Sequence, residues 1–441
     1  MSLRHFLRSA YLIGVYFTLT IAPLFVMLTD PTPPGRGFWR ECSIGLGFVG
    51  LSMMGLQFFL TGRFQRLTSP YGIDVVYHFH RNISLIAFLF IFLHAVILFI
   101  SSPETLILLN PVISPWWMIV GVAGLLAFAI VIVTSLYRLK FGLCYEHWRL
   151  IHGYISVVAV ALSVAHIIGV GYYVEGYLKR GLWITMITAW LLALVYVRVM
   201  KPIIMLRRPY TIEKVKRERG NSWTLTLRPE GHKGMNFRPG QFAWLTIGKS
   251  PFSIREHPFS FSSSAMKTDS MQVTVKELGD FTSRIGEVAP GTRTYIEGPY
   301  GTFTVDRHVA PGYIFITGGV GITPVISILR TMADRNDRRP VLLFYSNKTW
   351  EGMTFREDLD ELEKQLNLRV VYIITGDAPE GWQGERGRIN AEMIARHLPA
   401  DRMRYKYFIC GPDPMQKAIK NELGNLGLSL ENVESESFNF V

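Results

Sequence analysis

Six long apolar runs constrain the fold of this chain more than any other feature. Each has about the 20 residues that a helix needs to cross the hydrocarbon core of a bilayer. Backbone N–H and C=O groups find no water in lipid, so spanning segments of this kind must be helical. We therefore predict a six-helix transmembrane bundle within residues 1–205, with spans at roughly 9–29, 42–61, 76–101, 116–137, 149–173 and 181–199.

Charge divides the chain near the same point. Residues 1–200 carry 13 Lys and Arg and 6 Asp and Glu, whereas residues 201–441 carry 33 and 28. This contrast indicates one part in lipid and a second part that is a globular module in water. The net charge of +12 does not call for nucleic acid as a partner, because Lys and Arg beside spanning helices contribute to the excess.

The loop charges predict the orientation in the membrane. Six spans put both ends of the bundle on one side, together with the segments 62–75, 138–149 and 198–208. That side carries eleven Lys and Arg residues, against four on the other. The positive-inside rule then predicts a multi-pass protein of the plasma or inner membrane. Its N-terminus and its soluble part are expected in the cytoplasm.

Four histidines repeat one spacing in the third and fifth apolar runs. His80 and His94 are 14 residues apart, and so are His152 and His166. On a helix, 14 residues rise about 21 Å and end about 40° short of four turns, so both members lie on one face. The two helices run in the same direction, so His80 is expected opposite His152 near the cytoplasm, and His94 opposite His166 farther out.

Imidazole pairs at two depths predict two b-type haems, because imidazole is a strong axial ligand of haem iron. Zinc or copper is the weaker alternative, because ligands about 21 Å apart cannot share one ion. Glycines of the second and fourth apolar runs are interpreted as close-packing positions between helices.

The soluble part shows two successive patterns. Short strands and turns over residues 209–308 predict an antiparallel β-barrel. Strands that alternate with helices over residues 312–441 predict an α/β domain with a parallel sheet. The expected strands are 223–228 and 243–247 in the barrel, and 313–317, 341–346, 368–374 and 405–410 in the α/β domain.

Two turns of the α/β domain indicate a nucleotide site. The segment TGGVGITP at 317–324 stands between a predicted strand and helix, where glycines let a pyrophosphate approach the N–H groups of a helix N-terminus. Cys410 and Gly411 end a later strand of the same sheet. Ligands of open α/β sheets lie at such strand ends, so the two turns together predict the site more specifically than either alone.

Five motifs in order resemble a known family. HPFSFSSS at 257–264, VKELGDFT at 275–282, EGPYG at 297–301, TGGVGITP and CGPDPM at 410–415 look like the signatures of the ferredoxin–NADP reductase flavoprotein module. Together with the four-histidine bundle, the chain is similar to the ferric reductase/NADPH oxidase superfamily over about residues 70–441. The resemblance implies FAD in the barrel and a nicotinamide nucleotide in the α/β domain.

The first of these motifs is the flavin motif. By resemblance, Phe259 packs on the flavin, Ser260 hydrogen-bonds near its N5 atom and acts in the reaction, and His257 with Pro258 completes the H-P-F-S form and faces the FAD phosphates. A flat apolar ring needs an aromatic surface, and N5 needs a donor that tunes its electronics.

The second motif matches the segment that meets the FAD pyrophosphate. The resemblance assigns Lys276, Gly279 and Thr282 to it, because a backbone turn and a hydroxyl can meet an anion. A lysine in water is the alternative for Lys276.

The resemblance also places the nicotinamide nucleotide. Gly319, Gly321 and Pro324 match its phosphate turn, while Cys410 and Gly411 match the strand end beside the nicotinamide. A small buried core residue is the alternative for Cys410.

Two further segments bear on the nicotinamide. Ser346 and Lys348 follow the strand where an adenosine 2′-phosphate lies in the family, which favours NADPH over NADH. The chain's last residues resemble the terminal E-x-F motif, whose aromatic covers the flavin. Phe438 fits that role by register and Phe440 is the second choice.

The function implied is transmembrane electron transfer by an NAD(P)H oxidase or ferric-chelate reductase. Electrons would pass from cytoplasmic NAD(P)H through FAD and two haems to dioxygen, giving superoxide, or to ferric chelates. Leu98 stands where related animal oxidases have a histidine that lines the oxygen site, which leaves the acceptor open. The alternatives are an electron-transfer subunit that serves quinone or an outer partner protein, and a transporter with degenerate flavin motifs.

Overall fold

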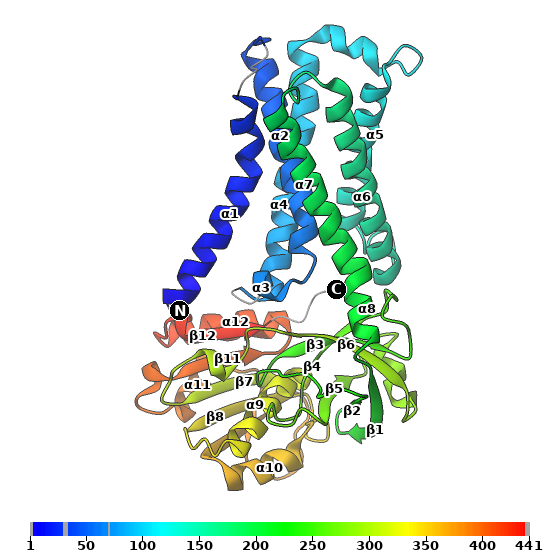
Figure 1. The fold of residues 1–441 in the computed structure, drawn as a ribbon. Helices are drawn as coiled ribbons and strands as arrows, with labels where there is room; N and C mark the ends of the chain where they lie inside the picture. The colour runs from blue at the N-terminus through cyan, green and yellow to red at the C-terminus, as the bar shows by residue number, and fades with distance from the viewer. Residues whose placement is uncertain (1–2, 30–33, 69–70, 437–441) are drawn as a thin grey trace. The chain divides into compact units, whose positions relative to one another are not determined.

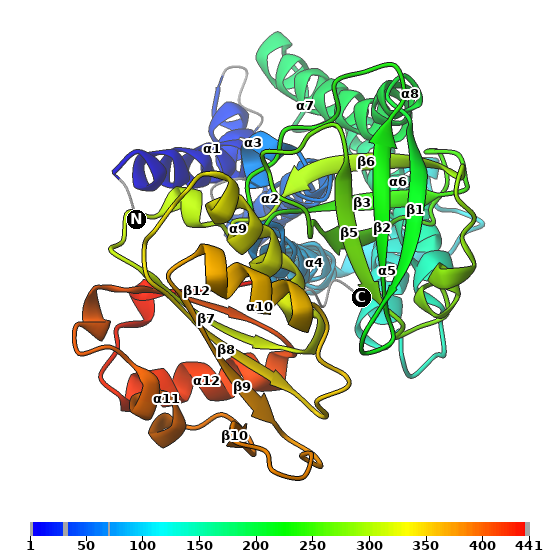
Figure 2. The same cartoon turned by 90° about the horizontal axis from the view of Figure 1, so that it is seen from below.

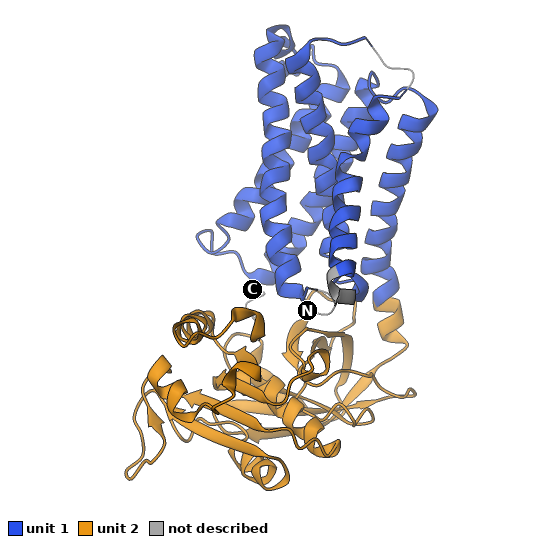
Figure 3. Cartoon of the chain, turned by 90° about the vertical axis from the view of Figure 1, so that its left-hand side faces the viewer, with its two compact units in different colours: residues 1–201 blue, residues 202–441 orange. Residues whose placement is uncertain are grey.

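The computed structural model describes residues 3–29, 34–68 and 71–436. The chain forms two compact units, Met1–Lys201 and Pro202–Val441, coloured blue and orange in Figure 3. The first holds the membrane-spanning helices and the second holds both sheets.

Among its described residues, the first unit contains six helices long and apolar enough to cross a membrane (Figure 1). They confirm the six predicted spans, and the last continues through a π-helical turn (Tyr196–Met200) into α8 (Lys201–Leu206). Two short elements, α3 (Gln65–Thr68) and a 3-10 helix (Pro103–Leu109), lie between them. The spanning helices are α1 (Leu3–Met27), α2 (Phe38–Leu60), α4 (Ile73–Ser101), α5 (Trp116–Leu136), α6 (Tyr145–Val170) and α7 (Tyr177–Val195).

Small residues allow close packing of α2 on α4 and of α5 on α6. A Cβ at Gly50 of α2 would lie 2.7 Å from Cγ1 of Ile91 in α4, and one at Gly124 of α5 would lie 3.0 Å from Oγ of Ser163 in α6. Small side chains at helix interfaces are how bundles pack in lipid, where apolar burial gives no drive of its own. Each histidine-bearing helix is thus backed by one partner helix.

The second unit begins with an antiparallel sheet of order β4-β3-β6-β1-β2-β5. Its inner face buries apolar side chains such as Leu225, Leu227 and Val273. β1 was not predicted, because five of its nine residues are charged. The strands are β1 (Tyr210–Glu218), β2 (Ser222–Pro229), β3 (Phe242–Ile247), β4 (His257–Ser260), β5 (Met271–Lys276) and β6 (Arg293–Tyr300).

A parallel sheet of order β10-β9-β8-β7-β11-β12 follows. Helices α9 (Ile322–Asp334) and α10 (Arg356–Gln365) cover one face, and α11 (Ala391–His397) and α12 (Asp413–Asn425) the other (Figure 2). Both sheets confirm the predicted fold class. The strands are β7 (Tyr313–Gly318), β8 (Val341–Asn347), β9 (Leu368–Ile374), β10 (Glu385–Arg386), β11 (Lys406–Cys410) and β12 (Val433–Glu436).

The strand order reverses between β7 and β11, which are neighbours in the sheet. From β7 the chain first runs outward through β8 and β9, and then returns to add β11 and β12 on the other side. Such a switch point leaves a crevice at the carboxyl ends of the two strands, which is where ligands of open α/β sheets bind.

Candidate functional site

The structure brings the four predicted histidines together as two pairs between α4 and α6. The ring centres of His80 and His152 are 6.3 Å apart, and those of His94 and His166 are 6.5 Å apart. A metal–imidazole bond is about 2 Å long, so two imidazoles on opposite sides of one metal have ring centres about 6 Å apart. Both separations therefore fit an axial pair.

The ring nitrogen Nδ1 of His80 is held by Gln57 of α2. The distance from His80 Nδ1 to Oε1 of Gln57 is 2.8 Å, and the amide Nε2 of Gln57 donates to the main-chain oxygen of Met53, also at 2.8 Å. Because the NH₂ group is engaged with Met53, the amide oxygen faces the ring and His80 must donate from Nδ1. Its Nε2 then keeps a lone pair for a metal.

Ser135 of α5 holds His152 in the same way. Its hydroxyl donates to the main-chain oxygen of Val131 at 2.6 Å, so the oxygen of Ser135 accepts from Nδ1 of His152, 3.1 Å away. This leaves the Nε2 lone pair of His152 available as well.

Main-chain carbonyls hold the two histidines of the other pair. Nδ1 of His94 donates to the carbonyl oxygen of Ser43 in α2 at 2.9 Å, and the Ser43 hydroxyl donates back to the carbonyl of His94 at 2.7 Å. Nδ1 of His166 donates to the carbonyl of Trp117 in α5 at 2.8 Å. Hydrogen bonds of this kind fix ring orientation and raise the basicity of metal-binding imidazoles.

Two glycines let the backing helices approach these rings. A Cβ at Gly47 of α2 would lie 3.1 Å from Cγ of His94, and one at Gly121 of α5 would lie 2.5 Å from Nδ1 of His166. Both glycines lie at positions that we expected to serve close packing, and here the packing partner is an imidazole. Helix periodicity gives no signal for this contact, because it does not fix how one helix is rotated against another.

A cavity adjoins His94 and His166. Apolar side chains including Leu98 make up most of its wall. A flat, largely apolar macrocycle with two axial imidazoles suits these walls. Within residues 3–29, 34–68 and 71–436, no group of three or more His, Cys, Asp and Glu side chains surrounds a metal-sized point.

A polar cluster that the sequence did not predict adjoins this cavity. Tyr173 lines the cavity and donates its hydroxyl to Oε1 of Glu41 at 2.7 Å. The backbone N–H of Arg36 donates to the same oxygen at 3.0 Å, and the Arg36 guanidinium lies 3.6 Å from the ring centre of Tyr172. These contacts tie the segment before α2 to the end of α6.

In the second unit, β4 presents the flavin motif along the edge of the barrel. His257 stacks on Phe281 with ring centres 4.0 Å apart and planes at 14°, and Phe259 lies 6.4 Å from the same ring. Ser260 is buried at the end of the strand. Phe281 lies inside the motif VKELGDFT but was not among the predicted site residues, although an aromatic there extends the surface offered to a flat ring.

The predicted pyrophosphate segment forms a tight turn after β5. Oγ1 of Thr282 accepts from the N–H groups of Leu278 and Gly279 at 3.0 and 2.9 Å. Lys276 points toward the α/β domain, since its Nζ is 3.9 Å from the place that a Cβ of residue 319 would occupy. The ammonium of Lys276 therefore reaches the glycine turn at 317–324 of the α/β domain.

The two nucleotide turns meet at the switch point. Gly319 has a φ of +55°, and a Cβ at Gly321 would lie 2.3 Å from the carbonyl oxygen of Cys410. Gly411 follows Cys410 in the chain. Pro324 lies in the first turn of α9, where a missing N–H costs no intrahelical bond. The structure thus places all five predicted residues at one edge of the sheet.

Cys410 is fully buried at the end of β11, paired with Thr317 on one side and Glu436 on the other. Burial and the nearby Glu436 carboxylate raise the pKa of the Cys410 thiol, so it stays neutral at physiological pH. Nε2 of Gln416 donates to the carbonyls of Gly411 and Glu436 at 2.8 and 3.0 Å. This bridge fixes the last described residue beside the nucleotide turn.

The remaining predicted residues fall in two places. Ser346 is buried at the end of β8 and Lys348 is exposed just after it, while Asn347 between them ties the following loop by donating from Nδ2 to the carbonyl of Gly352 at 2.6 Å. Phe438 and Phe440 lie outside the described residues.

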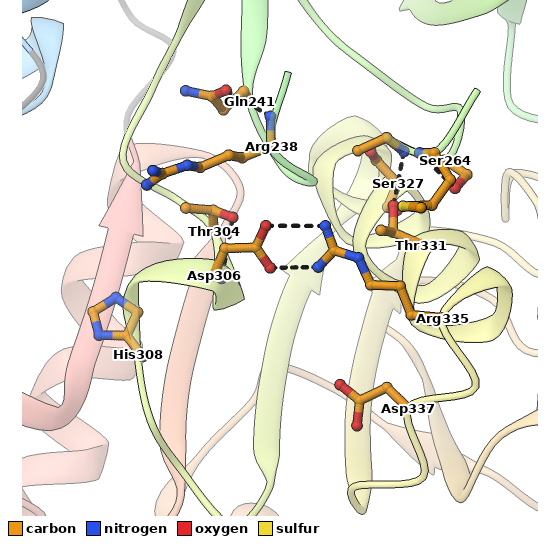
Figure 4. Close-up of polar contacts among 12 residues, drawn as sticks. Arg238, Gln241, Ser264, Thr304, Asp306, His308, Ser327, Thr331, Arg335 and Asp337 are labelled. Carbon is orange, nitrogen blue, oxygen red and sulfur yellow. Dashed lines mark hydrogen bonds and ion pairs between the residues drawn. The ribbon is translucent and has the colours of Figure 1, made fainter. Parts of the chain in front are cut away.

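Helix α9 links the nucleotide turn to the barrel. Oγ of Ser327 donates to the carbonyl of Ser263 at 2.7 Å, and Oγ1 of Thr331 accepts from the N–H of Ala265 at 2.9 Å. Figure 4 shows these contacts beside the ion pair of Arg335 with Asp306, which has N–O distances of 2.6 and 3.2 Å. Of the two residues that α9 contacts, Ser263 belongs to the flavin motif and Ala265 directly follows it.

Three family descriptions match successive parts of the chain. Residues 46–163 match "Ferric reductase like transmembrane component", residues 210–304 match "FAD-binding domain", and residues 315–421 match "Oxidoreductase NAD-binding domain". The first match contains His80, His94 and His152, and His166 lies three residues beyond it.

The chain has the ferric reductase/NADPH oxidase architecture. An oxidoreductase flavoprotein with an NAD-binding domain and a membrane component was expected from the motifs, and the matches confirm it. Ferric reductase-like and flavoprotein parts occur here in a single chain.

Curated relatives match part of the chain. NADH-cytochrome b5 reductase 1 of Mortierella alpina is 31% identical over 159 residues, which are 36% of this chain and 53% of the relative. The glycine betaine monooxygenase reductase subunit of Chromohalobacter salexigens is 29% identical over 210 residues, 46% of this chain and 56% of the relative. The chain thus spans little more than half the length of these relatives.

Solved structures share the fold at low identity. Flavohemoglobin from Malassezia yamatoensis is 16% identical with a TM-score of 0.51, and the alignment covers 92% of this chain and 100% of that one. The FAD/NAD-binding domain of a nitric oxide dioxygenase from Vibrio cholerae is 20% identical with a TM-score of 0.46, over 52% of this ferric reductase-like chain and 97% of that domain. At such identities the likeness concerns the fold alone.

Proposed function

We propose that this protein oxidises cytoplasmic NAD(P)H on FAD and carries the electrons across the membrane to an acceptor on the outer side. The haem domain would be residues 1–205, the FAD domain 209–308 and the NAD(P)H domain 312–441. One hydride carries two electrons, so each NAD(P)H oxidised reduces two one-electron acceptors and releases one proton on the cytoplasmic side.

The observation that carries the proposal is the pair of facing imidazole sets. His80 with His152 and His94 with His166 have the separation of axial ligands, and all four rings donate from Nδ1. Two haems bound there would supply one-electron carriers at two depths of the bilayer. A hydride cannot cross the lipid, whereas stacked one-electron carriers can conduct across it.

The second unit would load these carriers. Phe259 and Phe281 would offer the aromatic surface for the flavin, and Ser260 at the end of β4 would tune its N5 atom. Gly319 and Gly321 would admit the pyrophosphate of the nicotinamide nucleotide, and Lys276 with Gly279 and Thr282 would meet the pyrophosphate of FAD. The neutral thiol of Cys410 would pack beside the nicotinamide as a small apolar surface and would not react as a nucleophile.

Dioxygen and ferric chelates are the acceptors that we propose. Leu98 and Phe99 line the cavity beside His94, so this part of the wall offers apolar surface and no imidazole. Superoxide and ferrous products both form by addition of one electron without a proton. Ser346 and Lys348 at the end of β8 support NADPH over NADH, because a 2′-phosphate takes hydrogen bonds from a hydroxyl and a cation.

The second candidate is an electron-transfer subunit that serves quinone or an outer partner protein. The Tyr173–Glu41 cluster with Arg36 beside the outer cavity favours this reading, because a fixed polar rim suits a docking surface.

Steady-state turnover of the purified full-length chain separates these functions. NADPH and NADH are each offered with dioxygen, ferric citrate or a water-soluble quinone, and superoxide is detected with and without superoxide dismutase. Turnover with dioxygen or ferric citrate alone supports the proposal. Turnover that needs quinone or an added protein supports the subunit reading, and no haem in the purified chain contradicts both.

A further inference from the structure

The two imidazole pairs differ in what holds their Nδ1 hydrogens. The pair His80 and His152 is held by side chains, those of Gln57 and Ser135. The pair His94 and His166 is held by main-chain carbonyls, and at His94 the hydroxyl oxygen of Ser43 lies 3.0 Å from Nδ1 as a second neighbour. A main-chain carbonyl is present whatever residue stands at its position, whereas a side-chain acceptor is present only with particular residue types.

We infer that Gln57 and Ser135 are positioning residues that set the redox potential of the haem held by His80 and His152. The inference rests on the proposed function, because it requires a haem at this pair. It goes further by assigning control of the carrier nearer the cytoplasm to two residues on α2 and α5, neither of which touches the iron.

The chemistry follows from the direction of the hydrogen bonds. An imidazole that donates from Nδ1 to a strong acceptor is more basic at Nε2, and a more basic axial ligand stabilises ferric over ferrous iron. The Gln57 amide oxygen is a neutral acceptor at 2.8 Å, and the Ser135 hydroxyl is a weaker one at 3.1 Å. Removing either acceptor should therefore raise the midpoint potential, and a charged acceptor should lower it.

The surroundings of Gln57 make the effect specific. Its side chain is 7% exposed and its NH₂ group is bonded to the carbonyl of Met53, so water has little access to replace a lost acceptor. Glutamate has the same shape with a carboxylate in place of the amide, and leucine fills a similar volume with no acceptor. The two substitutions should thus move one potential in opposite directions, which a packing defect would not do.

The experiment is an anaerobic spectroelectrochemical titration of the full-length protein in lipid nanodiscs, with the two haem midpoints fitted separately. His94→Ala, which should keep the haem of His80 and His152 alone, identifies which midpoint belongs to that pair. We expect this midpoint to rise in Gln57→Leu and Ser135→Ala and to fall in Gln57→Glu. An acceptor worth about tenfold in ferric preference corresponds to about 59 mV for a one-electron couple.

Two matched controls lie on the same helices. Ser52 of α2 is fully buried, and Thr134 of α5 bonds the carbonyl of Ile130. Ser52→Ala and Thr134→Val should leave both midpoints in place.

Several outcomes overturn the inference. These are equal midpoints in Gln57→Leu and Gln57→Glu, shifts in the same direction, or shifts of the other haem. If Gln57→Leu binds one haem where wild type binds two, Gln57→Glu and Ser135→Ala decide, and an unchanged midpoint in both is contrary evidence. A wild-type protein without two bis-imidazole haems would instead refute the proposed function, which is a separate result.

Discussion

Replacing Gly121 by alanine should displace His166 and weaken binding of the haem proposed for His94 and His166. A Cβ at this position would lie 2.5 Å from Nδ1 and 3.0 Å from Cε1 of His166, whereas non-bonded atoms rest about 3.5–4 Å apart. The ring would have to move by about 1 Å. Nδ1 is also the atom that donates to the carbonyl of Trp117 at 2.8 Å, so the same movement breaks that bond.

The magnitude follows from the bond that is lost. A buried donor left without its partner costs about 1–3 kcal/mol, which corresponds to about 5- to 150-fold weaker binding. Haem and FAD are measured together in the purified protein by pyridine haemochromogen and flavin absorbance. The ratio of haem to FAD should fall from two toward one in Gly121→Ala. Gly47→Ala should act more weakly, because its Cβ would lie 3.1 Å from His94.

The control for this prediction is Gly181→Ala in α7. A Cβ there meets nothing within 4 Å, so the haem content should be that of wild type. Two haems per FAD in Gly121→Ala, with an unchanged reduced spectrum, would show that His166 is not an axial ligand or that α5 is not packed on it in this way.

Three further predictions concern the second unit. Gly321→Ala would place a Cβ 2.3 Å from the carbonyl oxygen of Cys410. Stopped-flow reduction of bound FAD by NADPH should then slow by more than about tenfold, because misplacing a reacting group by about 1 Å can cost about 100-fold in rate, while FAD content is kept. Truncation before residue 437 removes Phe438 and Phe440 and should change the NADPH-to-NADH rate ratio; an unchanged ratio counts against a flavin-covering aromatic. Burial lowers the pKa of His308 from 6.5 to about 4, so between these pH values the unfolded chain binds a proton more readily than the folded chain. The free energy of unfolding should therefore decrease as the pH is lowered from 6.5 to 4. His308→Gln should flatten this fall in thermal unfolding measured from pH 7 to 4.

The membrane helices could be predicted from sequence because an apolar run in lipid can satisfy its backbone hydrogen bonds only as a helix. The spacing of His80 and His94, repeated in His152 and His166, also survives any choice of helix packing, because both members of a pair share one helix face. The parallel sheet was also predictable, because a strand that is buried on both faces, such as β7 with all six residues buried, forms an unbroken run of mainly apolar residues in the sequence.

The residues around the imidazoles could not be predicted in this way. Gln57, Ser135 and Gly121 act on histidines of other helices, and their effect depends on the rotation and offset of α2 against α4 and of α5 against α6. Those quantities are set by side-chain packing across the interface, such as Gly50 on Ile91, and leave no periodic signal.

Edge strands were also missed. β12 has the sequence VESE, in which two of four residues are charged, so it reads as a loop. It becomes a strand because β11 offers it a free edge, with Cys410 paired to Glu436. Polar residues are expected on edge strands, which meet water on one side.

The measurement that tests the central claim most directly is electron transfer across a sealed membrane. Full-length protein is reconstituted in liposomes that hold ferricyanide inside, NADPH is added outside, and lumenal ferricyanide is followed by its absorbance. Chains with the second unit outward should bleach the enclosed ferricyanide, and His94→Ala should not, although its FAD is still reduced. Equal bleaching in His94→Ala, or none in wild type whose FAD is reduced, would contradict transfer through the two imidazole pairs.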